Sequence, residues 1–258
     1  MVKMMNDVKS VKDFEFLDIL EKNHHIFKNE LESFFQDKLV TKQVLKQVST
    51  AKKSIKSDKS LWKVLGFRLH GKTALEFIEE HNLNINKFTT FLTKIIARYI
   101  FKNHFKETQK IIKTLYDKEE CGIINVWYSI FEPGAKLGLH VNNDPYMYRA
   151  HLGVIVPDGD MGLKVKDDTV HWAEGKLFVF DPTNPHTAWN YSDRNRIVLI
   201  VDFFKPEGNR SELEKMERDQ VAMLIKEDPM SFGMSGGYFD LDDAVIKQYG
   251  LPHIEEGV

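Results

Sequence analysis

Apolar residues recur with helical spacing in the first part of the chain. Between residues 14 and 40 they return every three or four positions, as at Phe16, Leu20, Phe27 and Leu31. The stretch from 82 to 116 shows the same spacing. This period is typical of an amphipathic helix and not of the alternation seen in strands. We therefore predict that residues 1–118 form a helical part that packs on the rest of the protein.

From Cys121 onward the pattern changes to short strands separated by turn-forming residues. Segments rich in β-branched and aromatic residues lie at 122–131, 146–156, 162–166, 169–172, 176–180 and 194–204. Helices followed by strands at this spacing predict an α+β fold with a β-sandwich or jelly roll as its core. We expect this core to span residues 119–206. Residues 207–258 would add a charged helix at 211–226 and a tail without recognisable chemistry.

The composition is that of a folded protein and excludes several classes. Hydrophobic residues make up 42% and charged residues 29% of the 258, enough for a core and too balanced for a disordered chain. The single cysteine, Cys121, excludes a disulfide framework and a multi-cysteine zinc site, and it favours a reducing compartment. We see neither an apolar run of about 18–20 residues nor an apolar leader. We therefore expect a cytoplasmic protein without a membrane span.

Positive charge is concentrated between Lys42 and Lys72, where nine bases stand against one acid, Asp58. Such a segment would suit an anionic partner, such as a nucleic acid, a carrier protein or a lipid headgroup. A solvated helical surface is the simpler interpretation. Nucleic acid is disfavoured, because aromatic residues do not alternate with these lysines as a stacking platform requires.

Candidate binding residues stand within three of the predicted strands. The period of two places Trp127 and Ser129 on one face of the first strand, and Arg149 and His151 on one face of the second. Arg196 stands beside the apolar run of the last strand. Because an unpaired buried charge is costly, Arg196 needs an anionic partner. A bound dicarboxylate would supply one, since the guanidinium fork matches a carboxylate.

Two histidines, His140 and His186, follow turn segments at opposite ends of the strand region. Two neutral imidazoles with a carboxylate and open positions make a centre for Fe(II) oxygen chemistry. A single histidine is more typically a hydrogen-bonded structural residue. The spacing alone therefore leaves open whether this pair binds a metal.

Taken together, these motifs resemble the aspartyl/asparaginyl β-hydroxylase family. The resemblance covers about residues 14–206, and its motifs are the run Ser129–His140 (SIFEPGAKLGLH), the tripeptide Arg149-Ala-His151, the pentapeptide Trp172–Lys176 (WAEGK), and the stretch from Phe180 through His186 and Arg196 to Asp202. It implies an Fe(II)- and 2-oxoglutarate-dependent dioxygenase on a double-stranded β-helix, the jelly-roll core also found in cupins.

The resemblance implies that His140 and His186 are the iron ligands. Many oxygenases of this fold also carry a carboxylate in a His-x-Asp motif, but here Asn142 stands at that position. Animal members of the family lack this carboxylate too, so its absence does not exclude activity. Water, the amide oxygen of Asn142 or a halide would fill the third position, and Asp144 would reach it only if its turn folds back.

The resemblance also implies how the cosubstrate is held. Arg196 and Ser129 would bind the distal carboxylate of 2-oxoglutarate, and Arg149 and His151 would contact its keto-acid end. Trp127 shares a face with Ser129 and would touch cosubstrate or substrate.

The expected reaction is hydroxylation of an unactivated C–H bond in an amino acid or an Asp/Asn-type peptidyl side chain. It would consume 2-oxoglutarate and O2 and release succinate and CO2. Relatives in the family act on peptide modules, free amino acids or lipid acyl chains. The missing membrane segment disfavours a lipid, and the missing secretory signal disfavours extracellular modules. Two alternatives stay open: a halogenase that uses the third iron position, and a non-catalytic jelly-roll binding protein.

Overall fold

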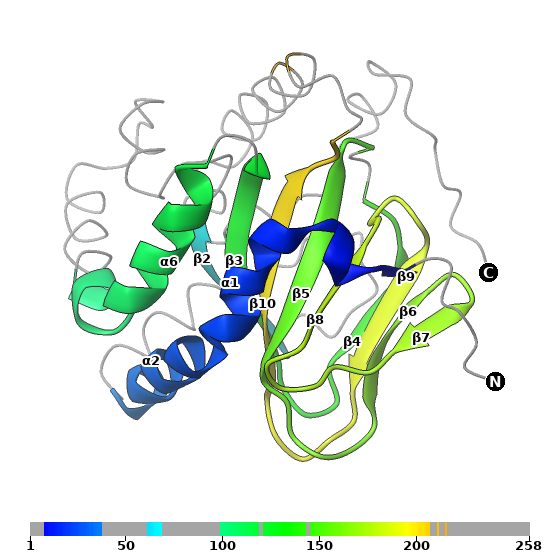
Figure 1. Cartoon of the computed structure of the whole chain (residues 1–258). Helices are drawn as coiled ribbons and strands as arrows, with labels where there is room; N and C mark the ends of the chain where they lie inside the picture. Colours follow the sequence, from blue (N-terminus) through cyan, green and yellow to red (C-terminus); the bar gives the residue numbers. More distant parts are fainter. Residues whose placement is uncertain are drawn as a thin grey trace, which may run out of the picture.

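The computed structural model describes residues 8–37, 61–68, 99–118, 121–142 and 145–206, with the isolated residues Ser211 and Lys215. Two antiparallel sheets form the centre of this part of the chain (Figure 1). The larger sheet has the strand order β1-β8-β5-β10-β3-β2 and the smaller has the order β4-β9-β6-β7. The larger sheet contains β1 (Val8–Lys9), β2 (Trp62–Arg68), β3 (Ile123–Phe131), β5 (Met147–Ile155), β8 (Leu177–Phe180) and β10 (Arg196–Phe204). The smaller contains β4 (Lys136–His140), β6 (Met161–Val165), β7 (Asp168–Val170) and β9 (His186–Asn190).

The chain alternates between the two sheets as it proceeds. Strands β3, β5, β8 and β10 lie in the larger sheet, whereas β4, β6 and β9, which lie between them in sequence, belong to the smaller. This alternation is the topology of a double-stranded β-helix, a form of jelly roll. The prediction of an α+β fold with a jelly-roll core is confirmed.

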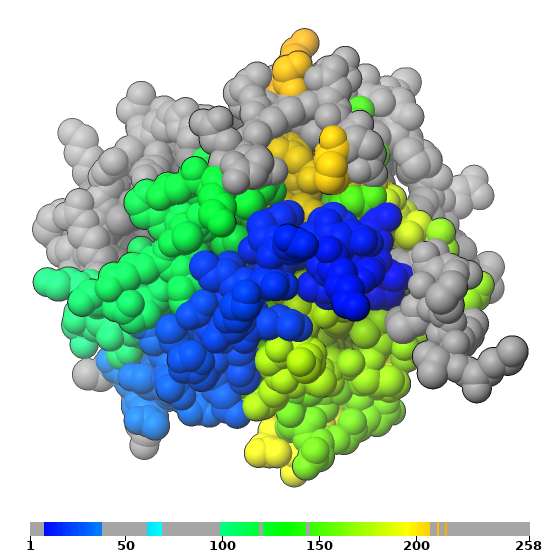
Figure 2. Space-filling model, viewed as in Figure 1, coloured from blue at the N-terminus to red at the C-terminus, as the bar shows by residue number. Residues whose placement is uncertain are grey.

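Helices cover the larger sheet. Helices α1 (Asp18–Lys22) and α2 (His24–Gln36) lie between β1 and β2 in the sequence, and α6 (Lys106–Tyr116) precedes β3. In the described ranges, α2 packs against β5 and α6 against β3. Figure 1 shows α1 and α2 in front of the larger sheet, and Figure 2 shows residues 8–37 (blue) lying directly on the strand residues coloured yellow-green. The helical spacing of residues 18–36 and 106–116 thus gave the correct element type.

The helical prediction for residues 1–118 is wrong at β1 and β2. β2 pairs with β3 in antiparallel register, with Trp62 opposite Phe131 and Val64 opposite Ser129. A short apolar run such as Trp62–Phe67 is ambiguous by period, and here pairing with a long central strand decides its conformation. The expected domain limits at 118 and 206 stay predictions.

Strands β4 and β9 were also absent from the predicted set. Their sequences, KLGLH and HTAWN, contain a single β-branched residue, Thr187. Enrichment in such residues was the criterion for strands, so it missed both. Three segments with predictions lie outside the described residues: the basic segment apart from 61–68, the predicted helical residues 82–98, and nearly all of 207–258.

Candidate active site

The two candidate metal ligands lie side by side on the smaller sheet. β4 and β9 pair in antiparallel register, and His140 is directly opposite His186. Their ring centroids are 4.1 Å apart, with an angle of 51° between the planes. His186 directly follows the turn at 181–185, as expected, whereas His140 is the last residue of β4, and the two histidines are adjacent in the fold rather than at its opposite ends. They are cross-strand neighbours, the arrangement that brings two side chains closest in a sheet.

The backbone orients both imidazole rings in the same way. His140 Nδ1 lies 2.8 Å from the carbonyl oxygen of Gly138, and His186 Nδ1 lies 2.8 Å from that of Asn184. A carbonyl oxygen only accepts, so each Nδ1 donates its hydrogen and each Nε2 keeps a free lone pair. His140 Nε2 is buried and has no hydrogen-bond partner in the described part of the chain.

Both rings are neutral at physiological pH. Burial lowers the pKa of His140 to about 4. Burial, assisted by the neighbouring His140, lowers the pKa of His186 well below its usual range. Neutral imidazoles held by a backbone carbonyl at Nδ1 are the form in which histidine binds metals through Nε2. The pair therefore fits a divalent ion.

Protein carboxylates do not complete this pair within the described residues, where no group of three His, Cys, Asp or Glu could hold a metal ion. The nearby Asp181 is engaged, because its Oδ1 accepts from the Thr183 amide at 3.0 Å and its Oδ2 lies 2.5 Å from Lys205 Nζ. Asn142 is half-buried, and its backbone N–H donates to the carbonyl of Pro182 at 2.9 Å. Asp144 lies outside the described residues.

A cavity between the two sheets lies next to His186. Five of the predicted site residues line it, namely Ser129, Arg149, His151, His186 and Arg196. Apolar side chains from both sheets form the rest of its wall, together with Trp62 and Trp172. His140 contacts this group through His186. Trp127 and Asn142 do not line the cavity. The ring of Trp127 instead lies against Arg149, whose guanidinium is 5.1 Å from the centroid of the Trp127 ring.

Arg196 is a buried cation without a carboxylate partner among the described residues. It is 1% exposed, and its guanidinium lies 4.0 Å from the ring centroid of Phe131 and 4.3 Å from that of Trp172. Nη1 donates a long bond of 3.4 Å to the Ser129 carbonyl, and Nε has no hydrogen-bond partner there. Desolvation lowers its pKa to about 9, which still leaves it charged at neutral pH. The expected anionic partner of Arg196 is therefore not a carboxylate of the described residues, and a bound dicarboxylate stays a prediction.

Arg149 has a carboxylate partner that the sequence analysis missed. Its Nε and Nη2 donate to Oδ1 and Oδ2 of Asp202 at 2.7 and 3.0 Å, and both side chains are buried. Asp202 lies directly opposite Arg149 on β10 and also accepts from Asn125 at 3.1 Å. An aspartate in an apolar strand was the sequence feature that pointed to such a partner. The pair is electrically neutral, so Arg196 supplies the net positive charge of the cavity.

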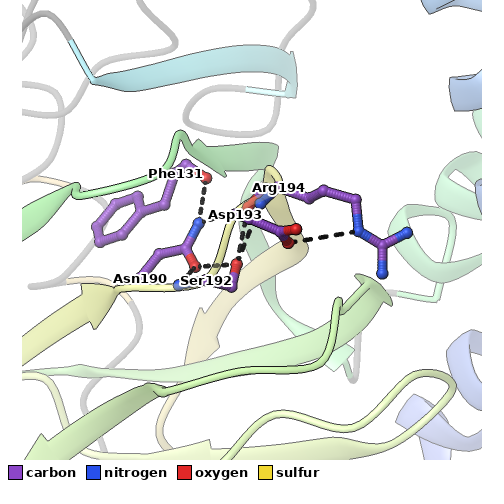
Figure 3. Close-up of polar contacts among 5 residues, drawn as sticks. All are labelled: Phe131, Asn190, Ser192, Asp193 and Arg194. Carbon is purple, nitrogen blue, oxygen red and sulfur yellow. Dashed lines mark hydrogen bonds and ion pairs between the residues drawn. The ribbon is translucent and has the colours of Figure 1, made fainter.

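The turn between β9 and β10 fixes the strands that carry His186 and Arg196 (Figure 3). The side-chain amide of Asn190 donates to the carbonyls of Phe131 and Arg194, both at 2.9 Å. Its Oδ1 accepts from the Ser192 hydroxyl at 2.7 Å. These bonds tie the end of β3, which carries the Phe131 ring, to the start of β10. The polar turn thereby aligns Arg196 with the aromatic ring beside it.

Comparison with known proteins identifies the family of this chain. Residues 21–206 match the family model described as Aspartyl/Asparaginyl beta-hydroxylase. An ornithine lipid ester-linked acyl 2-hydroxylase from Rhizobium tropici is 44% identical over 89 residues, which are 33% of this chain and 31% of that protein. The aspartyl/asparaginyl beta-hydroxylase of Mus musculus is 28% identical over 101 residues, 39% of this chain and 14% of that protein. The matched segments thus span less than a third of either relative.

Among solved structures, a cupin domain of a transcriptional regulator from Enterobacter cloacae is similar, with a TM-score of 0.29 and 15% identity over 34% of this chain and 87% of that one. Separately, none of the described helices has the length and apolar character needed to cross a membrane.

Proposed function

Because the chain belongs to the aspartyl/asparaginyl beta-hydroxylase family, we propose that it is an Fe(II)- and 2-oxoglutarate-dependent dioxygenase that hydroxylates an unactivated C–H bond. Family membership makes it a hydroxylase homologue; the metal and the cosubstrate are the proposal. One observation carries it. Two neutral imidazoles with free Nε2 lone pairs lie beside a cavity whose wall contains an uncompensated arginine.

The donor set fits Fe(II), with His140 and His186 binding through Nε2. When bound, iron would supply the oxygen chemistry that converts C–H to C–OH while 2-oxoglutarate is split into succinate and CO2. The chain's own contribution is to hold the two rings in one tautomer and to keep the cavity dry with apolar walls. Two neutral ligands leave the full charge of the ion to attract an anionic cosubstrate.

The cavity residues fit a keto-diacid. Arg196 would pair with the distal carboxylate, with the Ser129 hydroxyl beside it. Arg149, held rigidly by Asp202, and His151 would donate to the keto-acid end. A dianion would compensate the charge of Arg196 and part of the charge of the metal.

We propose an amino acid or a peptidyl side chain of the Asp/Asn type as the substrate, in line with the name of the matched family. A second candidate is an acyl chain attached to an amino-acid headgroup. It is favoured by the 44% identity to a relative named for acyl 2-hydroxylation of ornithine lipid.

The test is turnover with a substrate panel. Purified protein, Fe(II), 2-oxoglutarate and O2 would be incubated with amino acids, Asp- and Asn-containing peptides, and ornithine lipid. We expect a product heavier by one oxygen and an equal amount of succinate for one class, and neither product with His186→Ala. A chloride-dependent chlorinated product would indicate the halogenase instead. Succinate formation by His186→Ala equal to that of the wild type would refute the proposal.

A further inference from the structure

Two tryptophan N–H groups donate hydrogen bonds to two uncharged polar side chains of the cavity wall, Ser129 and His151. Trp62 Nε1 on β2 lies 3.1 Å from Ser129 Oγ, and Trp172 Nε1 lies 3.4 Å from His151 Nδ1. Both bonds are buried. The sequence analysis placed Trp172 in a motif without a role and did not single out Trp62. Their ring nitrogens are the feature that matters here.

Each of these two hydrogen bonds limits where the accepting side chain, His151 or Ser129, can place its own hydrogen. An indole N–H only donates, so His151 Nδ1 must be the unprotonated nitrogen and Nε2 must carry the hydrogen. Burial, together with Arg149 and Arg196, lowers the pKa of His151 well below its usual range, so the ring is neutral. His151 Nε2 is buried and has no partner among the described residues, although the ring lines the cavity.

The same reasoning applies to Ser129. Its hydroxyl oxygen accepts from Trp62, which leaves its single hydrogen for another group. Across the described residues, no protein acceptor takes this hydrogen, and the side chain lines the cavity. Together with the N–H groups of Arg149 and Arg196, both polar residues therefore face the cavity as donors. His186, the candidate metal ligand, is the remaining polar side chain of the wall.

The backbone holds Trp172 in place. The Gly153 amide donates to the Lys176 carbonyl at 3.0 Å, and the Gly175 amide donates to the Gly153 carbonyl at 2.9 Å. A Cβ on Gly153 would lie 2.3 Å from the Ala173 carbonyl oxygen, so only glycine allows this approach. The indole also lies over the Arg196 guanidinium at 4.3 Å. One rigid side chain thus contacts the groups proposed for both ends of the cosubstrate.

We propose that Trp62 and Trp172 are positioning residues that make the cavity wall a set of hydrogen-bond donors and so select a fully ionised keto-diacid. The identity of the ligand rests on the proposed function; the direction of the two hydrogen bonds does not. An ω-amide such as 2-oxoglutaramate would turn an NH2 group toward Ser129 and Arg196, leaving buried donors facing each other. Sites built to pair with one polar group reject analogues that leave it unpaired.

The first experiment uses the metal-free protein. The 15N NMR signals of the histidine side chains distinguish protonated from unprotonated ring nitrogens, and His151→Gln assigns those of His151. We expect the Nε2–H form in the wild type and a mixture of both forms in Trp172→Phe. Trp189→Phe is the matched control, because its Nε1 donates to the exposed Asp160 at 2.8 Å and not to the cavity. An unchanged Nε2–H form in Trp172→Phe would overturn the role of Trp172.

The second experiment compares affinities under anaerobic conditions with Fe(II). The wild type should bind 2-oxoglutarate at least about 100-fold more tightly than 2-oxoglutaramate. Trp62→Phe frees the Ser129 hydroxyl to accept, so this ratio should fall about tenfold, as expected for one buried hydrogen bond. Trp189→Phe should keep the ratio. An unchanged ratio in Trp62→Phe would overturn the role of Trp62.

A rescue separates positioning from a merely structural effect. Trp172→Phe should weaken 2-oxoglutarate binding about tenfold. The side-chain amide introduced by His151→Gln offers an N–H near the place of Nε2, and it has no tautomers. Adding Trp172→Phe to His151→Gln should therefore cause no further loss of affinity for 2-oxoglutarate. A full second loss would show that Trp172 acts only through packing and would overturn the proposal. If wild-type protein binds neither keto acid, the proposed function fails, while the NMR result still decides the tautomer.

Discussion

The two arginines of the cavity stand on strands of the same sheet but in opposite electrostatic surroundings. Arg149 on β5 makes a bidentate pair with Asp202, its cross-strand neighbour. Arg196 on β10 lies between the rings of Phe131 and Trp172, with no carboxylate partner in the described ranges. Both are almost completely buried, at 3% and 1% exposure. Burial alone therefore does not distinguish them; the partner does.

The difference separates a charge that is compensated inside the protein from one that is left for a ligand. A buried ion pair with good geometry compensates most of its desolvation penalty within the protein, so Arg149 is fixed before any ligand arrives. Aromatic faces compensate the charge of Arg196 only in part. The folded protein thus keeps an unfavourable charge that an anionic ligand would relieve. This contrast predicts opposite responses to mutation.

Breaking the Arg149–Asp202 pair should have the largest effect. Asp202→Ala leaves a buried guanidinium unpaired and should lower the free energy of unfolding by about 3–5 kcal/mol. Arg149→Met should lower it by a similar amount, because it leaves the Asp202 carboxylate unpaired. Urea denaturation of the metal-free protein measures both. Asp193→Ala removes an exposed acid whose Oδ1 lies 3.8 Å from Arg194 Nε, and it should leave stability unchanged. Equal stability of all three variants would contradict the comparison.

Arg196→Met should have the opposite effect on stability. The metal-free protein should be as stable as the wild type or more stable, because a desolvated charge is replaced by an apolar chain. Anaerobic binding of 2-oxoglutarate with Fe(II) should weaken about 100-fold, because the distal carboxylate loses its ion pair. A large loss of stability with normal binding would mean that Arg196 is the structural arginine.

Ligand-induced stabilisation should follow the same division. At a 2-oxoglutarate concentration 100 times the Kd, with Fe(II) present, the wild type should gain about 2.7 kcal/mol. Arg196→Met should gain almost nothing at that concentration. Thermal unfolding with and without 2-oxoglutarate measures this, with Trp189→Phe as a control that should gain as much as the wild type. Equal gains in Arg196→Met would show that the anion binds elsewhere.

The smallest effect should come from Ser129→Ala. It removes one neutral donor to the distal carboxylate and should weaken 2-oxoglutarate binding about 3–10-fold. The free energy of unfolding should fall by about 1–3 kcal/mol, because the buried Trp62 N–H loses this acceptor while the packing stays. Titration of Ser129→Ala and Arg196→Met with 2-oxoglutarate under the same conditions compares their losses of affinity. A larger loss in Ser129→Ala than in Arg196→Met would contradict the proposed roles.

How much of this could be predicted from the sequence depends on the range of the interactions. Local patterns were sufficient for the long buried strands β3, β5 and β10 and for the shared face of Arg149 and His151. They could not show that His140 and His186 are opposite each other, because register between strands 46 residues apart is a property of the whole jelly roll. For the same reason they gave no partner for Arg149. The need of Arg196 for an anion was predictable, because it follows from one charge in one apolar strand.

The basic segment 42–72 lies outside the described residues apart from 61–68, so its anionic partner stays a prediction.

The most direct test of the central claim is anaerobic titration of the protein with Fe(II) and 2-oxoglutarate, following the visible charge-transfer band of the iron–keto acid chelate. We expect the band to saturate at one iron per chain in the wild type, to be absent in His140→Ala and His186→Ala, and to require far more 2-oxoglutarate in Arg196→Met. A band of wild-type intensity and midpoint in both histidine variants would contradict the account.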